Sequence, residues 1–265
     1  MLTNYHTHTT FSDGENSPEE VVLSAIEKGL SSIGFSDHGN TPYDLRYCMR
    51  DTLGYIAEIN ALKRKYAGLI QIYLGIEEDC FAPVDKSAFD YSIGSCHYIR
   101  VNGKYPPFDS NYDYFQKVLS LFESPIRLAE RYYEDFCEYI QKRKPDVIGH
   151  FDLITKYEEK ENPLFFHDEK YWEVAEKALL KALRSGSFFE INTGSITRGY
   201  RTTPYPHERL LRMIKKENGK IVLSSDSHQK DTLTAYFDEA KALLKDVGIK
   251  ETYYLYDGTW KKENI

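Results

Sequence analysis

Short apolar runs alternate with longer amphipathic stretches along most of the chain, and this rhythm limits the possible folds more than any other feature. The apolar runs have the length of buried strands, and the stretches between them have the length and periodicity of helices. Strands that alternate with helices indicate parallel βα units and the α/β class. Seven strands are predicted, at residues 2–5, 32–35, 70–75, 91–94, 147–148, 188–191 and 221–223.

The first predicted helix has clear signals at both ends. Ser17 can cap it, Pro18 suits its first position, and Glu20 completes a capping box. Gly29 can end it, because glycine readily adopts the left-handed conformation found after helices. Further helices are predicted at residues 52–65, 125–142, 169–185, 206–216 and 234–245.

The repeated units favour a closed barrel over an open doubly wound sheet, because the chain has no dinucleotide-binding fingerprint. We expect a single domain over residues 1–265, since no linker rich in Pro, Gly or Ser divides the chain. Residues 100–124 interrupt the rhythm and are rich in Tyr, Phe, Pro and Asn. We interpret this segment as an irregular excursion that serves as a lid or pocket wall.

Charge and hydropathy limit the partners of the chain. It has 34 basic and 41 acidic residues, and the net charge of −7 disfavours binding to nucleic acid. It has no apolar run of about 18 residues and no N-terminal signal pattern. We therefore expect a cytoplasmic protein without a membrane partner. Isolated reduced thiols are expected at the four cysteines, Cys48, Cys80, Cys96 and Cys137.

Histidines and carboxylates recur where the predicted strands end. Six of the eight histidines lie at such ends, and the exceptions are His167 and His207. The polar residues at the strand ends are His6, His8, Asp37, His38, Glu77, His97, His150, Asn192, Asp226 and His228. In a parallel α/β barrel these ends meet on one face. A single histidine is usually a packing or surface group, but burying this whole set would be costly without a shared partner.

Bound metal is the partner that these residue types favour, because imidazole and carboxylate together suit zinc, iron or manganese. The spacing supports this hypothesis. His6 and His8 flank one residue of an extended segment, so both rings face the same side. Asp226 and His228 repeat the arrangement near the far end of the chain. Either pair alone is a weak motif, but together with lone ligands at the intervening strands they predict a metal site.

Seven short segments, in order, resemble the polymerase and histidinol phosphatase (PHP) superfamily. They are His6-Thr-His8, Ser12-Asp13-Gly14, Ser36-Asp37-His38, Gly75-Ile76-Glu77, Ser95-Cys96-His97, Gly149-His150 and Ser225-Asp226-Ser227-His228. Within that family the chain is similar to the stand-alone histidinol-phosphate phosphatases, through the segments DHGNTPY, GHFDLI and EINTGSITRGYRTTPYP. The resemblance spans nearly the whole chain. It implies a distorted seven-stranded (β/α)7 barrel with the metal site at the C-terminal edge of the strands.

The resemblance also implies a trinuclear centre of three divalent ions, which are Zn, Fe or Mn. The first ion would be held by His6, His8, Glu77 and Asp226, the second by Glu77, His97 and His150, and the third by Asp13, His38 and His228. Many relatives have histidine at the position of Asp13. A carboxylate is a harder ligand, which favours manganese or iron at the third site. The motif selects Glu77 as the ligand rather than its neighbour Glu78.

The activity that the resemblance implies is hydrolysis of L-histidinol phosphate to L-histidinol and phosphate, in histidine biosynthesis. We expect a hydroxide that bridges two metals to attack phosphorus, with Asp226 or His228 managing protons. Arg198, Arg201 and Lys156 follow the strand ends, and we expect them to contact the phosphate of this small monoester. Candidates to line the substrate pocket are Tyr43, Tyr98 and the aromatic residues of 105–115.

Three other interpretations stay open. The same chemistry could act on a nucleotide, a sugar phosphate or a phosphotyrosine protein. A nuclease is disfavoured by the acidic balance and the lack of a basic stripe. A catalytically silent metal-binding module is disfavoured because none of the nine predicted ligands is missing. The sequence indicates neither the oligomeric state nor the metal.

Overall fold

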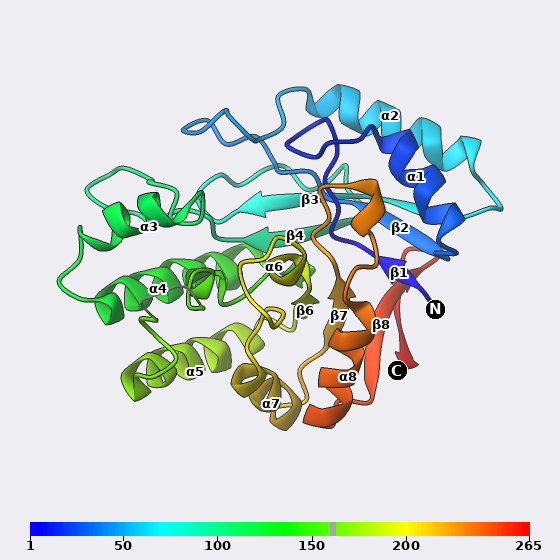
Figure 1. Ribbon diagram of the computed structural model, residues 1–265. Helices are drawn as coiled ribbons and strands as arrows, with labels where there is room; N and C mark the ends of the chain where they lie inside the picture. The colour runs from blue at the N-terminus through cyan, green and yellow to red at the C-terminus, as the bar shows by residue number, and fades with distance from the viewer. Residues whose placement is uncertain (160–162) are drawn as a thin grey trace.

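The computed structural model describes residues 1–159 and 163–265, and within them it shows one sheet of nine strands with helices on its outer side (Figure 1). The strands pair in chain order. They are β1 (Thr3–Asn4), β2 (Ser32–Phe35), β3 (Gln71–Asp79), β4 (Tyr91–Ser95), β5 (Val147–Ile148), β6 (Phe188–Asn192), β7 (Ile221–Ser224), β8 (Glu251–Tyr256) and β9 (Thr259–Asn264). Strands β1 to β8 are parallel, and β9 is antiparallel to β8. The predicted α/β class with a mainly parallel sheet is confirmed.

The seven predicted strands correspond to β1–β7, but the described chain has two more. Strands β8 and β9 form a hairpin around Asp257 and Gly258, which both have positive φ angles, 47° and 69°. An Asp-Gly pair between two strand-forming runs is a strong hairpin signal, and the sequence interpretation overlooked it. Strand β3 also extends to Asp79, so Glu77 lies inside a strand rather than after it.

The six predicted helices are all present, with ends shifted by at most a few residues. The helical segments are α1 (Pro18–Glu27), α2 (Thr52–Lys65), α3 (Tyr112–Leu119), α4 (Pro125–Arg143), η1 (Leu153–Thr155), α5 (Glu169–Leu183), α6 (Gly194–Thr197), α7 (Glu208–Lys216), η2 (Lys230–Thr232) and α8 (Phe237–Val247). The capping box of α1 is formed as expected, with Ser17 and Glu20 each bonding the other's backbone N–H. Gly29 follows this helix with φ 75°.

The segment 100–124 is more regular than expected, because it contains α3. Asn111 caps this helix by accepting a hydrogen bond from the backbone N–H of Tyr114. Phe115 and Val118 are buried, and they anchor the helix in the core. The prediction of an irregular excursion is therefore wrong for residues 112–119. This eight-residue helix is shorter than the window over which helical periodicity is read from a sequence.

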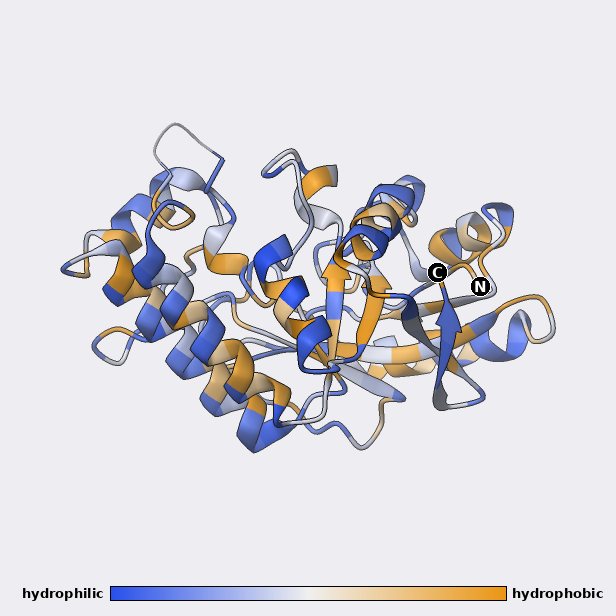
Figure 2. Ribbon diagram, turned by 90° about the horizontal axis from the view of Figure 1, so that it is seen from below, coloured by the Kyte–Doolittle hydropathy of each residue, from blue (hydrophilic) through white to orange (hydrophobic). Residues whose placement is uncertain are grey.

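The core lies on both sides of the sheet. Helices α4, α5, α7 and α8 pack on one stretch of strands, and α1 and α2 cover β2 and β3. In Figure 2 the central strands are mainly apolar and the helices carry both colours, as amphipathic helices should. The opposite side of the sheet buries a further cluster that gathers side chains from separate strands. It contains Tyr5, Tyr73, Tyr91, Ile93, Val147, Phe188, Val222 and Leu255.

The two ends of the described chain meet, since the Met1 ammonium forms an ion pair with Glu263 (Figure 1). Every helix within residues 1–159 and 163–265 is too short or too polar to cross a lipid bilayer. The four cysteines are free thiols. The expectation that the thiols are isolated is wrong for two of them. The Sγ atoms of Cys80 and Cys96 lie 3.0 Å apart, on segments that follow neighbouring strands.

Parallel pairing continues beyond the strands, and this brings the first and last polar segments together. Thr7 and Ser227 form an isolated parallel bridge. The backbone N–H of Ser227 donates to the carbonyl of His6 at 3.1 Å, and His8 donates to Ser227 at 2.8 Å. His38 and Glu77 form a similar bridge beyond β2. The C-terminal ends of the strands therefore present their side chains to one shared region.

Candidate metal centre

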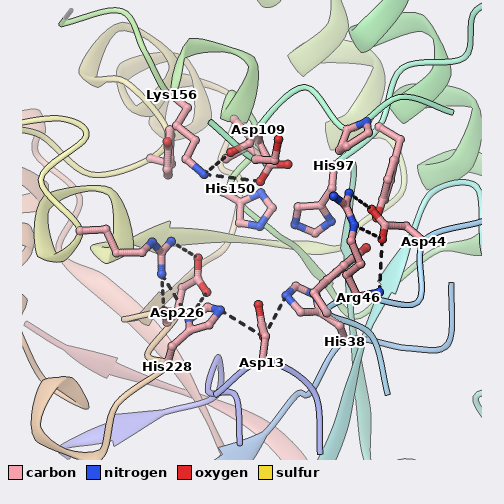
Figure 3. A pocket seen from close by; sticks show the side chains of 17 residues that line it. Asp13, His38, Asp44, Arg46, His97, Asp109, His150, Lys156, Asp226 and His228 are labelled. Atoms are coloured by element: carbon pink, nitrogen blue, oxygen red, sulfur yellow. Dashed lines mark hydrogen bonds and ion pairs between the residues drawn. The ribbon is translucent and has the colours of Figure 1, made fainter. Parts of the chain in front are cut away.

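All nine predicted ligands converge at the C-terminal ends of the parallel strands, and Figure 3 shows six of them around one cavity. Most of them lie directly after β1, β2, β4, β5 or β7, or in the loop that follows that strand. Glu77 lies within β3. Their side chains are buried except those of Asp13 and His228, which are 32% and 25% exposed. The cavity has a volume of about 390 Å³, within the range of small-molecule sites.

Glu77 is the centre of the cluster, and its two oxygens face different imidazoles. Oε2 lies 2.7 Å from His38 Nδ1, 3.3 Å from His6 Nε2 and 3.5 Å from His8 Nε2. Oε1 lies 3.2 Å from His150 Nε2 and 3.6 Å from His97 Nε2. A carboxylate placed between two sets of imidazoles has the geometry to join two metal sites.

Asp13 and Asp226 complete the cluster on the side of the cavity mouth. Asp13 Oδ1 lies 3.4 Å from His228 Nε2 and 3.6 Å from His38 Nε2. Asp226 Oδ1 lies 3.3 Å from His8 Nε2. The backbone of Asp226 has φ 50°, in the left-handed region that residues other than glycine rarely occupy. Such strain is commonly retained where a site requires a particular side-chain direction.

Several buried donor atoms in this cluster make no hydrogen bond within the described chain. They are His6 Nε2, both ring nitrogens of His8, Glu77 Oε2, and the Nδ1 atoms of His97 and His150. Buried polar atoms without partners are costly. Bound divalent cations would satisfy several of them, and more than one cation is needed because the two nitrogens of the His8 ring point in different directions. Donor atoms within 4.8 Å of one another form four overlapping groups in the described residues, and each of the nine side chains belongs to at least one. The residues therefore fit the metals that the sequence predicts.

Two carboxylates that the sequence interpretation missed hold the histidines in place. Glu190 Oε2 lies 2.9 Å from His6 Nδ1, and its other oxygen accepts from the backbone N–H of His150. Asp79 accepts from the N–H of His97 at 3.1 Å and lies 3.4 Å from its Nδ1. Carboxylates behind metal-binding imidazoles are typical of metalloenzymes, since they fix the ring and its tautomer. The available signal was an acidic residue within each of two buried strands.

Asp37, which the sequence placed at a strand end, stabilises the loop that carries Asp13. It accepts hydrogen bonds from the backbone N–H groups of Thr9 and Ser12, and from both of their hydroxyls. Asp37 is fully buried, so these four donors compensate for the loss of hydration. The Ser-Asp-His segment thus supplies a ligand candidate in His38 and a loop anchor in the residue before it.

The three basic residues expected at the phosphate have different positions. Arg198 and Lys156 line the cavity. Arg198 Nη2 lies 2.8 Å from Asp226 Oδ2, and its Nη1 donates to the Asp226 carbonyl. Arg201 is not among the described lining residues; its buried guanidinium lies 3.6 Å from Asp152 and donates to Thr155. This position gives Arg201 a structural part, and we retain only the other two as phosphate contacts.

The aromatic candidates also divide between two cavities. Tyr98 lines the cavity at the metal cluster, together with Tyr47, which the sequence interpretation did not select. Tyr43 and Tyr105 stack on each other and line a neighbouring cavity of about 670 Å³. The predicted pocket wall from segment 100–124 is partly realised, since Asp109 and Ser110 reach the first cavity.

Mutual electrostatics set the protonation of the cluster when no metal is bound. Burial alone would lower the pKa of His97, but Glu77 and Asp79 raise it to about 9. Burial would also lower the pKa values of His6 and His38, but neighbouring carboxylates outweigh it. Glu190 and Glu77 raise the pKa of His6, and Glu77 and Asp13 raise that of His38. His8 is different: burial and the neighbouring His228 and His38 lower its pKa to about 3.

These pKa shifts predict that metal binding releases protons. The imidazoles of His6 and His97 hold protons at neutral pH in the metal-free protein, and a metal binds only the neutral ring. Metal affinity should therefore rise with pH up to about 9, the pKa of His97. Calorimetric titration in buffers of different ionisation enthalpy measures the release, and a binding enthalpy independent of the buffer would contradict it.

The fold and this site define a metal-binding α/β protein whose candidate ligands lie at the C-terminal ends of parallel strands. The chain belongs to the PHP domain family, which matches it over residues 4–194.

Relatives and solved structures resemble the chain over most of its length. It is 29% identical over 253 residues to "Probable histidinol-phosphatase" of Schizosaccharomyces pombe, covering 87% of this chain and 81% of that protein. It is 29% identical over 263 residues to the histidinol-phosphatase of Lactococcus lactis, covering 93% and 91%. A crystal structure of histidinol phosphate phosphatase from L. lactis, complexed with Zn, L-histidinol and phosphate, superposes with a TM-score of 0.75. That pair shares 23% identity over 98% of each chain, and the likeness shows a common fold.

Proposed function

We propose that this protein is a metal-dependent phosphoric monoester hydrolase that converts L-histidinol phosphate to L-histidinol and phosphate. The observation that carries the proposal is the cluster of nine donor side chains, six of which line one cavity, with several buried donor atoms unsatisfied. Family membership supports the phosphoesterase class. The names of the relatives support the substrate.

Three metal ions would be held by the nine ligands as the sequence predicts, with Glu77 shared between two of them. Bound divalent ions would supply Lewis acidity toward the phosphoryl oxygens and acidify water. The protein's own residues position the substrate. Arg198 and Lys156 project a guanidinium and an ammonium into the cavity, where they can bind phosphate oxygens and offset the charge that develops during transfer.

Asp226 and His228 are the residues that we propose for proton handling. Burial alone would raise the pKa of Asp226, but Arg198 and His6 hold it well below its usual range. The carboxylate is therefore ionised at neutral pH, so it can accept a proton but cannot donate one in the resting state. His228 lies beside it, with Nδ1 3.7 Å from Asp226 Oδ1, and is the more exposed of the two.

Water should attack phosphorus directly, without a phosphorylated enzyme. Among the described lining residues, no serine or cysteine is paired with a free base, and Asp13, Asp44 and Asp226 are held by imidazoles or guanidinium groups. A single turnover in water labelled with heavy oxygen tests this step. The label should enter the released phosphate during that first turnover, and label derived from an enzyme carboxylate would exclude direct attack.

Arg198→Ala should raise KM by at least about 10-fold, because a guanidinium binds phosphate through two charge-assisted hydrogen bonds. It should also lower kcat, since Arg198 orients the Asp226 carboxylate at 2.8 Å. Metal content should be unchanged, and Arg198→Lys should recover part of the loss by restoring the charge. Steady-state kinetics and elemental analysis of both variants are the measurements. An unchanged KM in the alanine variant would reject the phosphate contact.

The substrate is tested by kinetics on a panel of phosphate monoesters after reconstitution with manganese, iron or zinc. L-histidinol phosphate should have a kcat/KM above those of a nucleotide, a sugar phosphate and a phosphotyrosine peptide. A higher value for any of these others would transfer the proposal to that substrate class.

We also propose that residues 1–265 form one domain and that its sheet closes as a distorted barrel. The backbone bonds that join His6 and His8 to Ser227 support closure, because they link the segments beyond β1 and β7. The aromatic cluster around Tyr5 supports it as well. Tyr5 has edge-to-face contacts with Tyr73 and Tyr91, from two strands farther along the sheet.

A further inference from the structure

We propose that the Asp109 carboxylate binds the ammonium group of the substrate, and so selects aminoalkyl phosphates over monoesters without an amine. This inference rests on the proposed phosphatase function, which it deepens by naming the residue that recognises the organic part. Its basis is the distribution of charge on the cavity wall beyond the metal ligands.

Among the described lining residues, the carboxylates that are not metal-ligand candidates belong to Asp44 and Asp109. Asp44 is already satisfied, because Arg46 binds both of its oxygens at 2.8 and 2.6 Å. The Asp109 carboxylate accepts no hydrogen bond from residues 1–159 or 163–265; its nearest cation is Lys156, whose Nζ lies 3.6 Å from Oδ2. Asp109 is therefore the lining acid with acceptor capacity left for a ligand.

The main chain of Asp109 is fixed although its carboxylate is not. Its carbonyl accepts from Lys156 Nζ at 2.6 Å and from the Tyr157 hydroxyl at 2.8 Å. These bonds hold Asp109 on the wall above His150, across the cavity from Asp226 and His228 (Figure 3). The side chain is 21% exposed, so a ligand in the cavity can reach it. The effective dielectric constant at a cavity wall is lower than in water. A carboxylate there therefore attracts a cation more strongly than a fully exposed carboxylate does.

The pair of Lys156 and Asp109 is complementary to the proposed substrate. Lys156 presents a positive charge for the phosphate, and Asp109 presents a negative charge next to it. L-histidinol phosphate carries its phosphate ester and its ammonium on neighbouring carbons. Its phosphate can therefore face Lys156 while its ammonium faces Asp109. Sugar phosphates, nucleotides and phosphotyrosine side chains have no ammonium at that position, and their hydroxyls or rings would leave the carboxylate without a cation.

The test compares Asp109→Asn with the wild type on two substrates, L-histidinol phosphate and its analogue with hydrogen in place of the amine. Asparagine keeps the shape and the backbone carbonyl that holds Lys156. The wild type should prefer the amine by about 10- to 100-fold in kcat/KM, the usual range for a hydrogen bond to a charged group. The variant should lose this preference, so that its kcat/KM values on the two substrates become similar. Asp113→Asn, an exposed change on the same segment, is the matched control and should retain the preference.

Calorimetric titration with L-histidinol provides a second readout that does not depend on turnover. The metal-loaded Asp109→Asn protein should bind L-histidinol at least about 10-fold more weakly than the wild type. A variant that keeps both the amine preference and the L-histidinol affinity would overturn the proposal. Failure of the proposed function is distinguishable, because the wild type itself would then show no preference for L-histidinol phosphate over the other monoesters of the panel.

Discussion

Glu77→Gln is expected to abolish phosphatase activity, with kcat lowered by at least about 10³-fold, because the variant loses the charge that joins two metal sites. Its two oxygens lie within 3.6 Å of five imidazoles, more than any other ligand of the cluster contacts. Glutamine preserves the volume but is a much weaker metal ligand. Elemental analysis should show that the variant loses at least one of the ions retained by the wild type, and a full metal complement with normal kcat would contradict Glu77's place at the centre.

Glu78→Gln is the matched control, since it removes the adjacent charge of the same strand. Glu78 points to the other side of β3, where Arg143 binds it at 2.9 and 2.7 Å. Weakening this partly buried pair should cost about 1–3 kcal/mol of stability, because the Arg143 side chain is 30% exposed. Metal content and kcat should stay near the wild-type values. Equal metal loss in the two variants would show that the effect of Glu77→Gln comes from general disruption of β3.

Removing the metals with a chelator should lower Tm by about 10 °C or more and eliminate activity reversibly. A metal present at a thousandfold excess over its Kd adds about 4 kcal/mol per site to the free energy of unfolding. For a domain near this size, each kcal/mol raises Tm by roughly 2–4 °C. The unsatisfied atoms of His6, His8 and Glu77 would be left buried without partners. Scanning calorimetry before and after chelation measures the shift.

Reloading with single metals then distinguishes the sites. Asp13 gives the third predicted site, which it shares with His38 and His228, a hard oxygen donor, and this favours manganese or iron there. Asp13→His should shift the preference of that site toward zinc. A chelated protein with unchanged Tm and activity would contradict a structural and catalytic role for metal. Identical metal preferences in the wild type and Asp13→His would reject the part assigned to this ligand.

The sequence was sufficient to predict that the nine candidate ligands lie together, because the signal was local. Each apolar run ends at a polar residue, and parallel strands bring their C-terminal ends together whatever the details of the helices. His6, Glu77 and Asp226 could therefore be assigned to one site although they are distant along the chain. The final hairpin was accessible in the same way, since Asp257 and Gly258 mark its turn, but that signal was overlooked.

Other features depend on packing that a single sequence does not contain. Glu190 and Asp79 are recognisable as partners of histidines only when neighbouring strands are in register. Arg201 follows a strand end as Arg198 does, yet it turns inward to Asp152 and away from the cavity. The direction of a loop side chain depends on three-dimensional neighbours. Asp109 lies in the loop before α3, and nothing in its sequence context indicated its position beside Lys156.

Anomalous diffraction from metal-loaded crystals would reveal the metal centre itself, because it locates each ion independently of activity. We expect three ions in one cluster. One lies among His6, His8, Glu77 and Asp226, one among Glu77, His97 and His150, and one among Asp13, His38 and His228. Ions bound only elsewhere, or no ordered ion within ligand distance of Glu77 in the loaded protein, would contradict this expectation.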